Sequence, residues 1–241
     1  MKALILAAGR GKRLGQTCEN KNKCMLSING KNLIEYSFDC ALSVSVTEIV
    51  IVVGYQADEI IRFYGECYKG KNIKYVRQNE PGGLVNAIEC ARESVGQEDF
   101  MLMLGDELLI HPKHDAMIEK FRQQNLFAAC GVIRVKDLNL IKKTYAVIQG
   151  VDERIVRLIE KPSKPWNDMM GTGNCLFRSQ IWDYIGQTPI NQKRGEKELP
   201  DLIQVAVDDG NVIKPVLICE QYVNVNNPEE IDRAESYFAH L

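Results

Sequence analysis

Short apolar strands and helical segments alternate through residues 2–104, and this alternation constrains the fold more than any other feature of the chain. Residues 2–8, which are apolar after Lys2, form a run of the kind found in buried parallel strands. The pattern predicts strands at residues 2–8, 48–53, 73–77 and 100–104, and helices at 33–42, 57–64 and 84–94. It therefore predicts an α/β fold, Rossmann-like, with a mixed, mainly parallel sheet and helices on both faces.

The later sequence has shorter connections, which indicate an antiparallel or mixed extension of the sheet. Strands are predicted at residues 127–135, 144–148, 154–159, 174–177, 212–218 and 222–225, and helices at 179–185 and 197–207. A last helix is predicted to follow Asn227 as its N-cap, with Pro228 in its first turn. Since no repeat or linker interrupts the sequence, we expect one domain over residues 1–241, with two halves that meet near residue 110.

Composition and charge exclude several classes of protein. The formal net charge is −2, so no broad basic surface is expected for nucleic acid or for an anionic membrane. No apolar run approaches the roughly 20 residues of a membrane-spanning helix, and the apolar start is better explained as a buried strand than as a signal peptide. The eight cysteines include no CxxC pair, which argues against structural zinc. We therefore expect a cytoplasmic protein with small-molecule partners.

Polar and glycine residues follow three of the predicted parallel strands. Residues 9–13 come after the first strand, Gln78 after the third and Asp106 after the fourth. Because parallel strands end at one edge of a sheet, and ligands bind beyond that edge, these residues are expected to form one site. The glycines let backbone amides approach phosphates, although a tight turn or a dinucleotide site has the same pattern. Arg13 and Lys23 add cations that suit a triphosphate.

Further motifs extend this pattern along almost the whole chain. They are Leu6-Ala7-Ala8-Gly9-x-Gly11-x-Arg13-Leu14, Lys23, Gly30-Lys31-x-Leu33-Ile34-Glu35-Tyr36, Gln78-x-x-Pro81-x-Gly83-Leu84-x-x-Ala87, Gly105-Asp106, Glu160-Lys161-Pro162, Gly195-Glu196-x-Glu198-Leu199-x-Asp201 and Asn224-Val225-Asn226-Asn227-Pro228-Glu229-Glu230. In this order they resemble the signatures of the sugar-phosphate nucleotidylyltransferases, in particular the glucose-1-phosphate thymidylyltransferases and uridylyltransferases. The opening motif with its spaced lysine is the most specific of them.

The resemblance implies a fold of the nucleotidyltransferase (GT-A-like) type, with a nucleotide-binding half of about residues 1–110 and an acceptor-binding half of about residues 111–241. It implies transfer of a nucleoside monophosphate from a pyrimidine nucleoside triphosphate to a sugar 1-phosphate. The sugar phosphate would attack the α-phosphorus in line and release pyrophosphate. The residues expected beside the nucleotide phosphates are Ala7, Ala8, Gly9, Gly11, Arg13 and Lys23.

The resemblance also implies a Mg2+ ion held by Asp106 and by a second ligand near the C-terminus. In the family that second ligand is usually the aspartate of a Trp-x-Asp-x-Gly pattern, whereas the matching position here is Asn224. Because an asparagine carbonyl oxygen can still coordinate magnesium, Asn224 is the expected second ligand, and Asn226 is the alternative.

Base and acceptor contacts complete the site that the resemblance implies. The expected contacts are Gln78 and Gly83 for the base, and Glu160, Lys161 and Asn174 for the acceptor. Ala146 occupies a position where the family usually has a glycine that approaches the sugar. The extra methyl group therefore predicts a changed acceptor pocket.

Three alternative hypotheses remain open. The first keeps the fold but makes the chain a cytidylyltransferase for phosphocholine or another phosphorylated alcohol. The second is a dinucleotide-binding oxidoreductase, although the second predicted strand ends in Gly54-Tyr55 and offers no acidic residue for a ribose. The third is a non-catalytic sensor, which the asparagine at position 224 permits. The sequence leaves open the choice of UTP, dTTP or CTP, the sugar, and the oligomeric state, with a homo-oligomer as one alternative.

Overall fold

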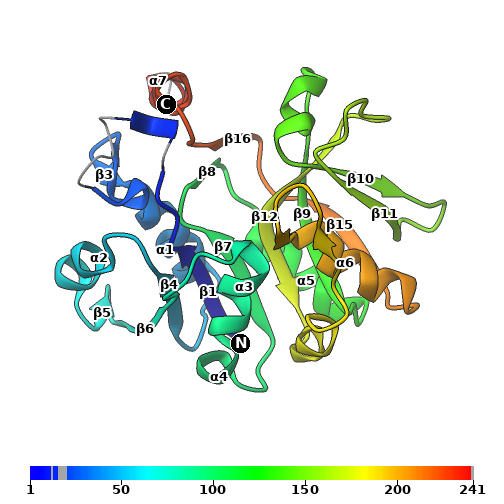
Figure 1. Cartoon of the computed structure of the whole chain (residues 1–241), viewed down its shortest axis with the longest axis horizontal. Helices are drawn as coiled ribbons and strands as arrows, with labels where there is room; N and C mark the ends of the chain where they lie inside the picture. Colours follow the sequence, from blue (N-terminus) through cyan, green and yellow to red (C-terminus); the bar gives the residue numbers. More distant parts are fainter. Residues whose placement is uncertain (12, 16–20, 240–241) are drawn as a thin grey trace.

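The computed structural model describes residues 1–11, 13–15 and 21–239, and a sheet of ten strands runs through it. The strands follow the order β11-β10-β12-β7-β1-β4-β6-β5, with β9 paired to β12 and β15 paired to β9. They are β1 Lys2–Ala7, β4 Ile49–Val53, β5 Cys67–Tyr68, β6 Lys71–Arg77, β7 Phe100–Leu104, β9 Ala128–Arg134, β10 Tyr145–Gln149, β11 Ile155–Glu160, β12 Met169–Phe177 and β15 Ile213–Leu217. Both halves of the chain contribute strands to this sheet (Figure 1).

The direction of the strands changes between the two halves. β1 runs parallel to β4 and to β7, and β4 runs parallel to β6. β12 then joins β7 in the antiparallel sense and pairs antiparallel with β9 and β10. The predicted fold class is confirmed, with a parallel N-terminal part and a mixed extension.

Alternate residues of the central strands pack into two separate cores, one on each face of the sheet. In β1, Ala3 and Ile5 belong to the first core, whereas Leu4 and Leu6 belong to the second. This division follows from the strand geometry, because successive side chains point to opposite faces. A strand that is buried on both faces must be apolar throughout, which explains the continuous apolar run at the start of the chain.

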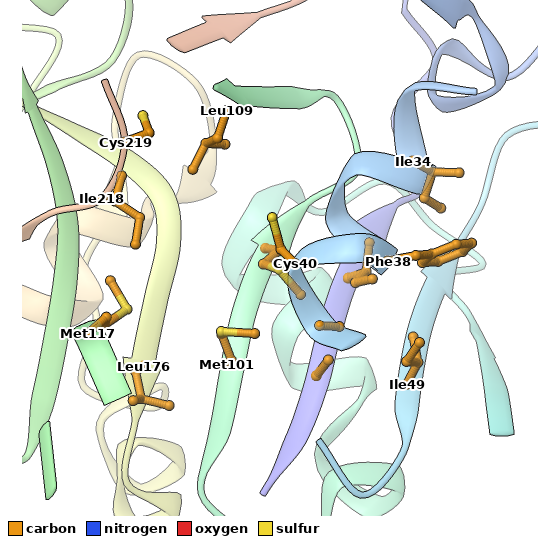
Figure 2. Packing of buried hydrophobic residues seen from close by; sticks show 14 of the residues in the cluster. Ile34, Phe38, Cys40, Ile49, Met101, Leu109, Met117, Leu176, Ile218 and Cys219 are labelled. Carbon is orange, nitrogen blue, oxygen red and sulfur yellow. The ribbon is translucent and has the colours of Figure 1, made fainter. Parts of the chain in front are cut away.

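Helices cover both faces of the sheet. The first core lies beneath α1 (Leu33–Ser43), α2 (Ala57–Tyr64) and α5 (His114–Gln123), and the second beneath α3 (Gly83–Cys90), α4 (Arg92–Val95), η4 (Ser179–Tyr184) and α6 (Leu199–Asp208). Figure 2 shows Ile34 and Phe38 of α1 near Ile49 of β4 in the first core. Phe38 has no exposed surface, and burying one such side chain contributes about 2 to 3 kcal/mol to stability.

The C-terminal segment returns to the N-terminal half. β16 (Gln221–Asn224) pairs antiparallel with β8 (Glu107–Ile110), and α7 (Pro228–Ser236) packs in a third apolar cluster near β2 (Ser27–Ile28). Figure 1 shows α7 in red above β3 (Lys31–Asn32), which pairs with β2. The predicted N-cap is confirmed, because the Asn227 side chain accepts a hydrogen bond from the Glu230 backbone N–H at 2.9 Å.

Some elements differ from the sequence prediction. The helix predicted at 84–94 is divided at Ala91 into α3 and α4, and the helix predicted at 179–185 is the 3-10 helix η4. The helix predicted at 197–207 begins only at Leu199, because residues 196–197 form β14 in a hairpin with β13 (Ile190–Asn191). The elements β8, α5 and the 3-10 helix η3 (Leu138–Lys143) were not predicted. Within the described residues, no helix has the length and apolarity to span a bilayer.

Candidate active site

The loop predicted to bind phosphates begins where β1 ends. Ala8 and Gly9 line a cavity there. Gly11 has a φ of 61°, in the left-handed region that glycine adopts without strain, so this turn favours a glycine. Ala7, by contrast, is buried, and its carbonyl oxygen accepts a hydrogen bond from the Asn22 side chain at 3.0 Å. The structure thus places Ala7 beneath the loop, and its contact with the nucleotide stays a prediction.

Lys23 forms a buried ion pair with Asp106. It begins the short 3-10 helix η2 (Lys23–Met25), which the Asn22 side chain caps by accepting the Cys24 N–H at 2.9 Å. The ammonium group contacts the Asp106 carboxylate and donates to Asn226 Oδ1 at 3.2 Å. Burial acts to lower the pKa of Lys23, but the attraction and hydrogen bond of Asp106 outweigh it, so this pKa is raised. Lys23 is thus a charged partner of Asp106.

Two cavities open at the carboxyl ends of the parallel strands, and they share part of their walls. The N-terminal cavity, of about 470 Å³, lies over the ends of β1, β4 and β6 and the start of α3. The C-terminal cavity, of about 420 Å³, lies between β10, β12, the β13–β14 hairpin and the segment after β16, and Arg13 lines it. The residues common to both cavities are Leu84, Leu104, Asp106 and Glu196. Asp106 therefore stands at the junction of the two cavities.

Gln78 and Gly83, the predicted base contacts, both line the N-terminal cavity. Gly83 has a φ of 85°, and a Cβ atom there would lie 2.8 Å from Glu196 Oε2, so both the backbone and the neighbouring hairpin require a glycine. Arg10 lines the same cavity and lies 6.0 Å from the centre of the Tyr55 ring. Arg10 was not predicted as a site residue, because no local pattern distinguishes it from the other surface cations of the chain.

Glu160 and Lys161 line the C-terminal cavity together with an arginine that was not predicted. Their side chains contact each other, and Arg194 Nη1 lies 3.6 Å from Glu160. Arg194 also pairs with Glu198 at 2.9 Å and with Glu196 at 3.2 Å. Arg194 lies in the turn of the β13–β14 hairpin, which brings its guanidinium group to these carboxylates. No local sequence pattern marked Arg194 as a residue of the site.

Asn174 does not line either cavity. Its side chain is 2% exposed, with Nδ2 donating to Glu107 at 2.8 Å and Oδ1 lying 2.9 Å from His114 Nε2. Glu107 also accepts the Gly173 N–H at 2.9 Å and the Tyr222 hydroxyl at 2.5 Å, and burial raises the pKa of Glu107 to about 8. The Asn174 amide is therefore committed to this network, whose members Glu107, Gly173 and Tyr222 line the C-terminal cavity, and a direct contact of Asn174 with the acceptor stays a prediction.

Asn224 and Asn226 both lie beside Asp106 in the C-terminal cavity. The β8–β16 ladder brings them there, because the Val225 N–H donates to the Asp106 carbonyl oxygen at 2.9 Å. Asn226 Oδ1 approaches the same ammonium group as Asp106, while Asn226 Nδ2 donates to Asn224 Oδ1 at 2.7 Å. Of the two, Asn226 is the one that shares a cation with Asp106. Across the described chain, no group of three or more His, Cys, Asp or Glu residues gathers as a metal site.

The methyl group of Ala146 does not enter the C-terminal cavity. Ala146 is 1% exposed and packs in the first core, whereas its neighbour Tyr145 lines the cavity. Since alternate residues of β10 point to opposite faces, the methyl group lies on the far side of the strand. The changed acceptor pocket predicted from Ala146 is therefore wrong.

A comparison with protein-family models agrees with this arrangement. The model described as nucleotidyl transferase matches residues 2–219, which include every element around the N-terminal cavity. The chain belongs to the nucleotidyl transferase family. The resemblance seen in the sequence motifs is thereby confirmed, and the chain is a nucleotidyltransferase.

Several curated family members are similar to the chain over most of its length. The UTP–glucose-1-phosphate uridylyltransferase AglF of Haloferax volcanii is 32% identical over 237 residues, which are 98% of this chain and 95% of AglF. The glucose-1-phosphate thymidylyltransferase of Streptomyces griseus is 28% identical over 230 residues, which are 94% of this chain but 63% of that protein. The chain thus spans nearly all of one relative and somewhat less than two thirds of the other.

Solved structures of the family share the fold. A UDP-glucose pyrophosphorylase complexed with UDP-glucose superposes with a TM-score of 0.88 at 21% identity, covering 99% of this chain and 98% of that one. A UTP-bound UGPase from Acinetobacter baumannii gives a TM-score of 0.85 at 20% identity, covering 98% of this chain and 92% of that one. At these identities the likeness establishes the fold alone.

Proposed function

We propose that this nucleotidyltransferase transfers a nucleoside monophosphate from a pyrimidine nucleoside triphosphate to a sugar 1-phosphate. The products are an NDP-sugar and pyrophosphate. The observation that carries the proposal is the junction of the two cavities at Asp106. A triphosphate in the N-terminal cavity and a sugar phosphate in the C-terminal cavity would meet at that carboxylate. The names of the relatives AglF and glucose-1-phosphate thymidylyltransferase support the same substrate classes.

The chemistry needs charge neutralisation and alignment, because both reacting groups are anionic. A phosphate oxygen of the acceptor attacks the α-phosphorus, the bond to the β-phosphate oxygen breaks, and that oxygen leaves with pyrophosphate. Ala8 and Gly9 would orient the triphosphate through their backbone, and Arg13 at the cavity margin would balance its charge. Lys161 and Arg194 would balance the acceptor phosphate. No covalent enzyme intermediate is required.

The oxygen atoms beside Asp106 fit a Mg2+ ion. The Asp106 carboxylate and Asn226 Oδ1 come from different segments and converge on one positive group, the Lys23 ammonium. Magnesium prefers such oxygen ligands and usually takes only one or two from the protein. We therefore infer that Asp106 and Asn226 would hold the ion, with Asn224 supporting Asn226. Bound there, magnesium would neutralise phosphate oxygens during transfer.

Asn226→Ala is expected to raise the magnesium concentration needed for half-maximal turnover by about tenfold, because one oxygen ligand is lost. Asn224→Ala should raise it less, since Asn224 acts through its hydrogen bond to Asn226. Magnesium titrations of both variants and of Asn226→Asp, which keeps an oxygen ligand, check this assignment. A larger increase for Asn224→Ala would instead make Asn224 the second ligand.

The C-terminal cavity favours a sugar phosphate over phosphocholine. Glu160 and Glu196 line it and can accept hydrogen bonds from sugar hydroxyl groups, which choline lacks. The N-terminal cavity would hold the base beside Gln78 and Gly83. We also propose that the protein works in the cytoplasm, with these small molecules as its partners and without nucleic acid or membrane.

A grid of triphosphates against phosphorylated acceptors, measured by pyrophosphate release, tests the proposal. We expect UTP or dTTP with a sugar 1-phosphate to exceed ATP or GTP by at least about tenfold in kcat/KM. Phosphocholine should support little turnover with any triphosphate. A preference for phosphocholine with CTP would favour the cytidylyltransferase hypothesis, and a preference for a purine would contradict the base site.

A further inference from the structure

The side-chain amide of Gln78 is held in one orientation by two hydrogen bonds. Its Nε2 donates to the Gly83 carbonyl oxygen at 3.2 Å and to Asn86 Oδ1 at 2.7 Å. A backbone carbonyl oxygen can only accept, so the Gly83 contact fixes which end of the Gln78 amide carries the nitrogen. Asn86 then must direct its own oxygen towards that nitrogen.

These two bonds use both N–H groups of the Gln78 amide. A primary amide has two donor hydrogens on nitrogen and an oxygen that only accepts. Gln78 lines the N-terminal cavity, and the group that it has left for a ligand is its acceptor, Oε1. Asn86 is outside the residues that line this cavity, so it acts on a ligand only through Gln78.

Asn86 is itself held in place. It is the fourth residue of α3, and a Cβ atom on Gly82 would lie 2.7 Å from Asn86 Cγ. The loop backbone before α3 therefore packs directly on the Asn86 amide, because residue 82 is a glycine. This packing restricts Asn86 and, through it, the Gln78 amide.

We propose that Asn86 is a positioning residue that sets the base specificity of this enzyme by fixing Gln78 as a hydrogen-bond acceptor. The inference rests on the proposed function, in which Gln78 faces the base. Uracil and thymine present an N3–H donor at the centre of their pairing edge, whereas cytosine presents an N3 lone pair there. A fixed acceptor that faces N3 therefore matches uracil or thymine and opposes cytosine. A Gln78 amide that was free to turn over would serve all three bases.

The test compares UTP with CTP in the wild type, Asn86→Leu and the matched control Asn86→Asp. Leucine has a similar volume but no acceptor, whereas aspartate keeps the acceptor for Gln78 Nε2. Binding of each triphosphate is measured by titration calorimetry, and kcat/KM is measured with glucose 1-phosphate. We expect the wild type and Asn86→Asp to favour UTP by at least about tenfold, and Asn86→Leu to reduce this preference to about threefold or less. The KM for glucose 1-phosphate should stay unchanged.

If Asn86 has a merely structural role, Asn86→Leu would weaken the binding of UTP and CTP equally. The ratio of UTP to CTP preference would then stay unchanged, which would overturn the inference. Equal use of CTP and UTP by the wild type would overturn it as well. If Asn86→Leu does not fold, Asn86→Ala removes the same acceptor with less strain and must give the same reduced ratio. Absence of turnover in every variant, with the binding ratios as expected, would reject the proposed function but leave the role of Asn86 supported.

Discussion

Asp106→Asn is expected to lower turnover by about a thousandfold at ordinary magnesium concentrations, as for the loss of a main transition-state charge contact. Asp106 lines both cavities and contacts the Lys23 ammonium, so its charge acts where the two substrates would meet. Asparagine keeps the shape and one oxygen atom but loses the negative charge that would bind the metal. The rate of pyrophosphate release, measured across a magnesium titration, gives the effect.

A matched control separates the effect of losing the Asp106 charge from the general effect of replacing an aspartate by asparagine. Asp183→Asn removes a carboxylate whose side chain is 70% exposed and lies 3.9 Å from Arg92, on the surface. This variant should keep wild-type turnover. Circular dichroism should show the native fold for both variants. If Asp106→Asn retained turnover within about threefold of the wild type, the assignment of the reaction to the cavity junction would be wrong.

Lys23→Ala is expected to lower kcat by about a hundredfold. Lys23 is 7% exposed, and its ammonium group bridges the Asp106 carboxylate and Asn226 Oδ1. Its removal leaves the carboxylate without its buried counter-charge and also removes a cation from the point of transfer. We expect the KM of the triphosphate to change less than kcat, because this cation acts at the reacting centre.

Lys21→Ala is the control for this variant, since Lys21 is exposed and only two residues away. Single-turnover kinetics of the two variants give the rate of the chemical step. Loss of kcat in both variants would point to a general disturbance of the loop. A normal kcat in Lys23→Ala would show that the buried pair serves stability alone.

The sequence was sufficient to predict the parallel half of the fold and the edge of the sheet at which the candidate binding residues lie. Residues 3–8 are apolar without interruption, and the structure confirms a strand over Lys2–Ala7 that is buried on both faces. Gln78 and Asp106 followed predicted strands, and the common direction of those strands brings the two residues to one edge. Order along the chain and strand direction were enough, because parallel neighbours end together.

Other features depended on contacts between residues far apart in the sequence. Asn174 was an expected acceptor contact, but its amide is engaged by Glu107 and His114, which lie 67 and 60 residues away. The choice between Asn224 and Asn226 likewise required the distances to Lys23 and Asn224 Oδ1. No local pattern reports such pairings, since they arise only when the C-terminal segment packs beside β8.

The missed helix α5 had a usable local signal. Met117, Ile118 and Phe121 are buried at helical spacing, and Asp115 lies in the first turn, where it favours the helix dipole. The division of α3 from α4 at Ala91 had no such local signal, because no glycine or proline marks the break. Helix boundaries that are set by tertiary packing are therefore harder to predict from the sequence than the presence of the helices themselves.

Within the substrate grid, one measurement tests the central claim most directly: the dependence of pyrophosphate release on the acceptor. The protein is incubated with magnesium and UTP, with or without glucose 1-phosphate, and pyrophosphate and NDP-sugar are measured in the same sample. Direct transfer between the two cavities predicts equal amounts of both products when the acceptor is present, and none when it is absent. Pyrophosphate release without acceptor, or no release under either condition, would contradict transfer at the junction marked by Asp106.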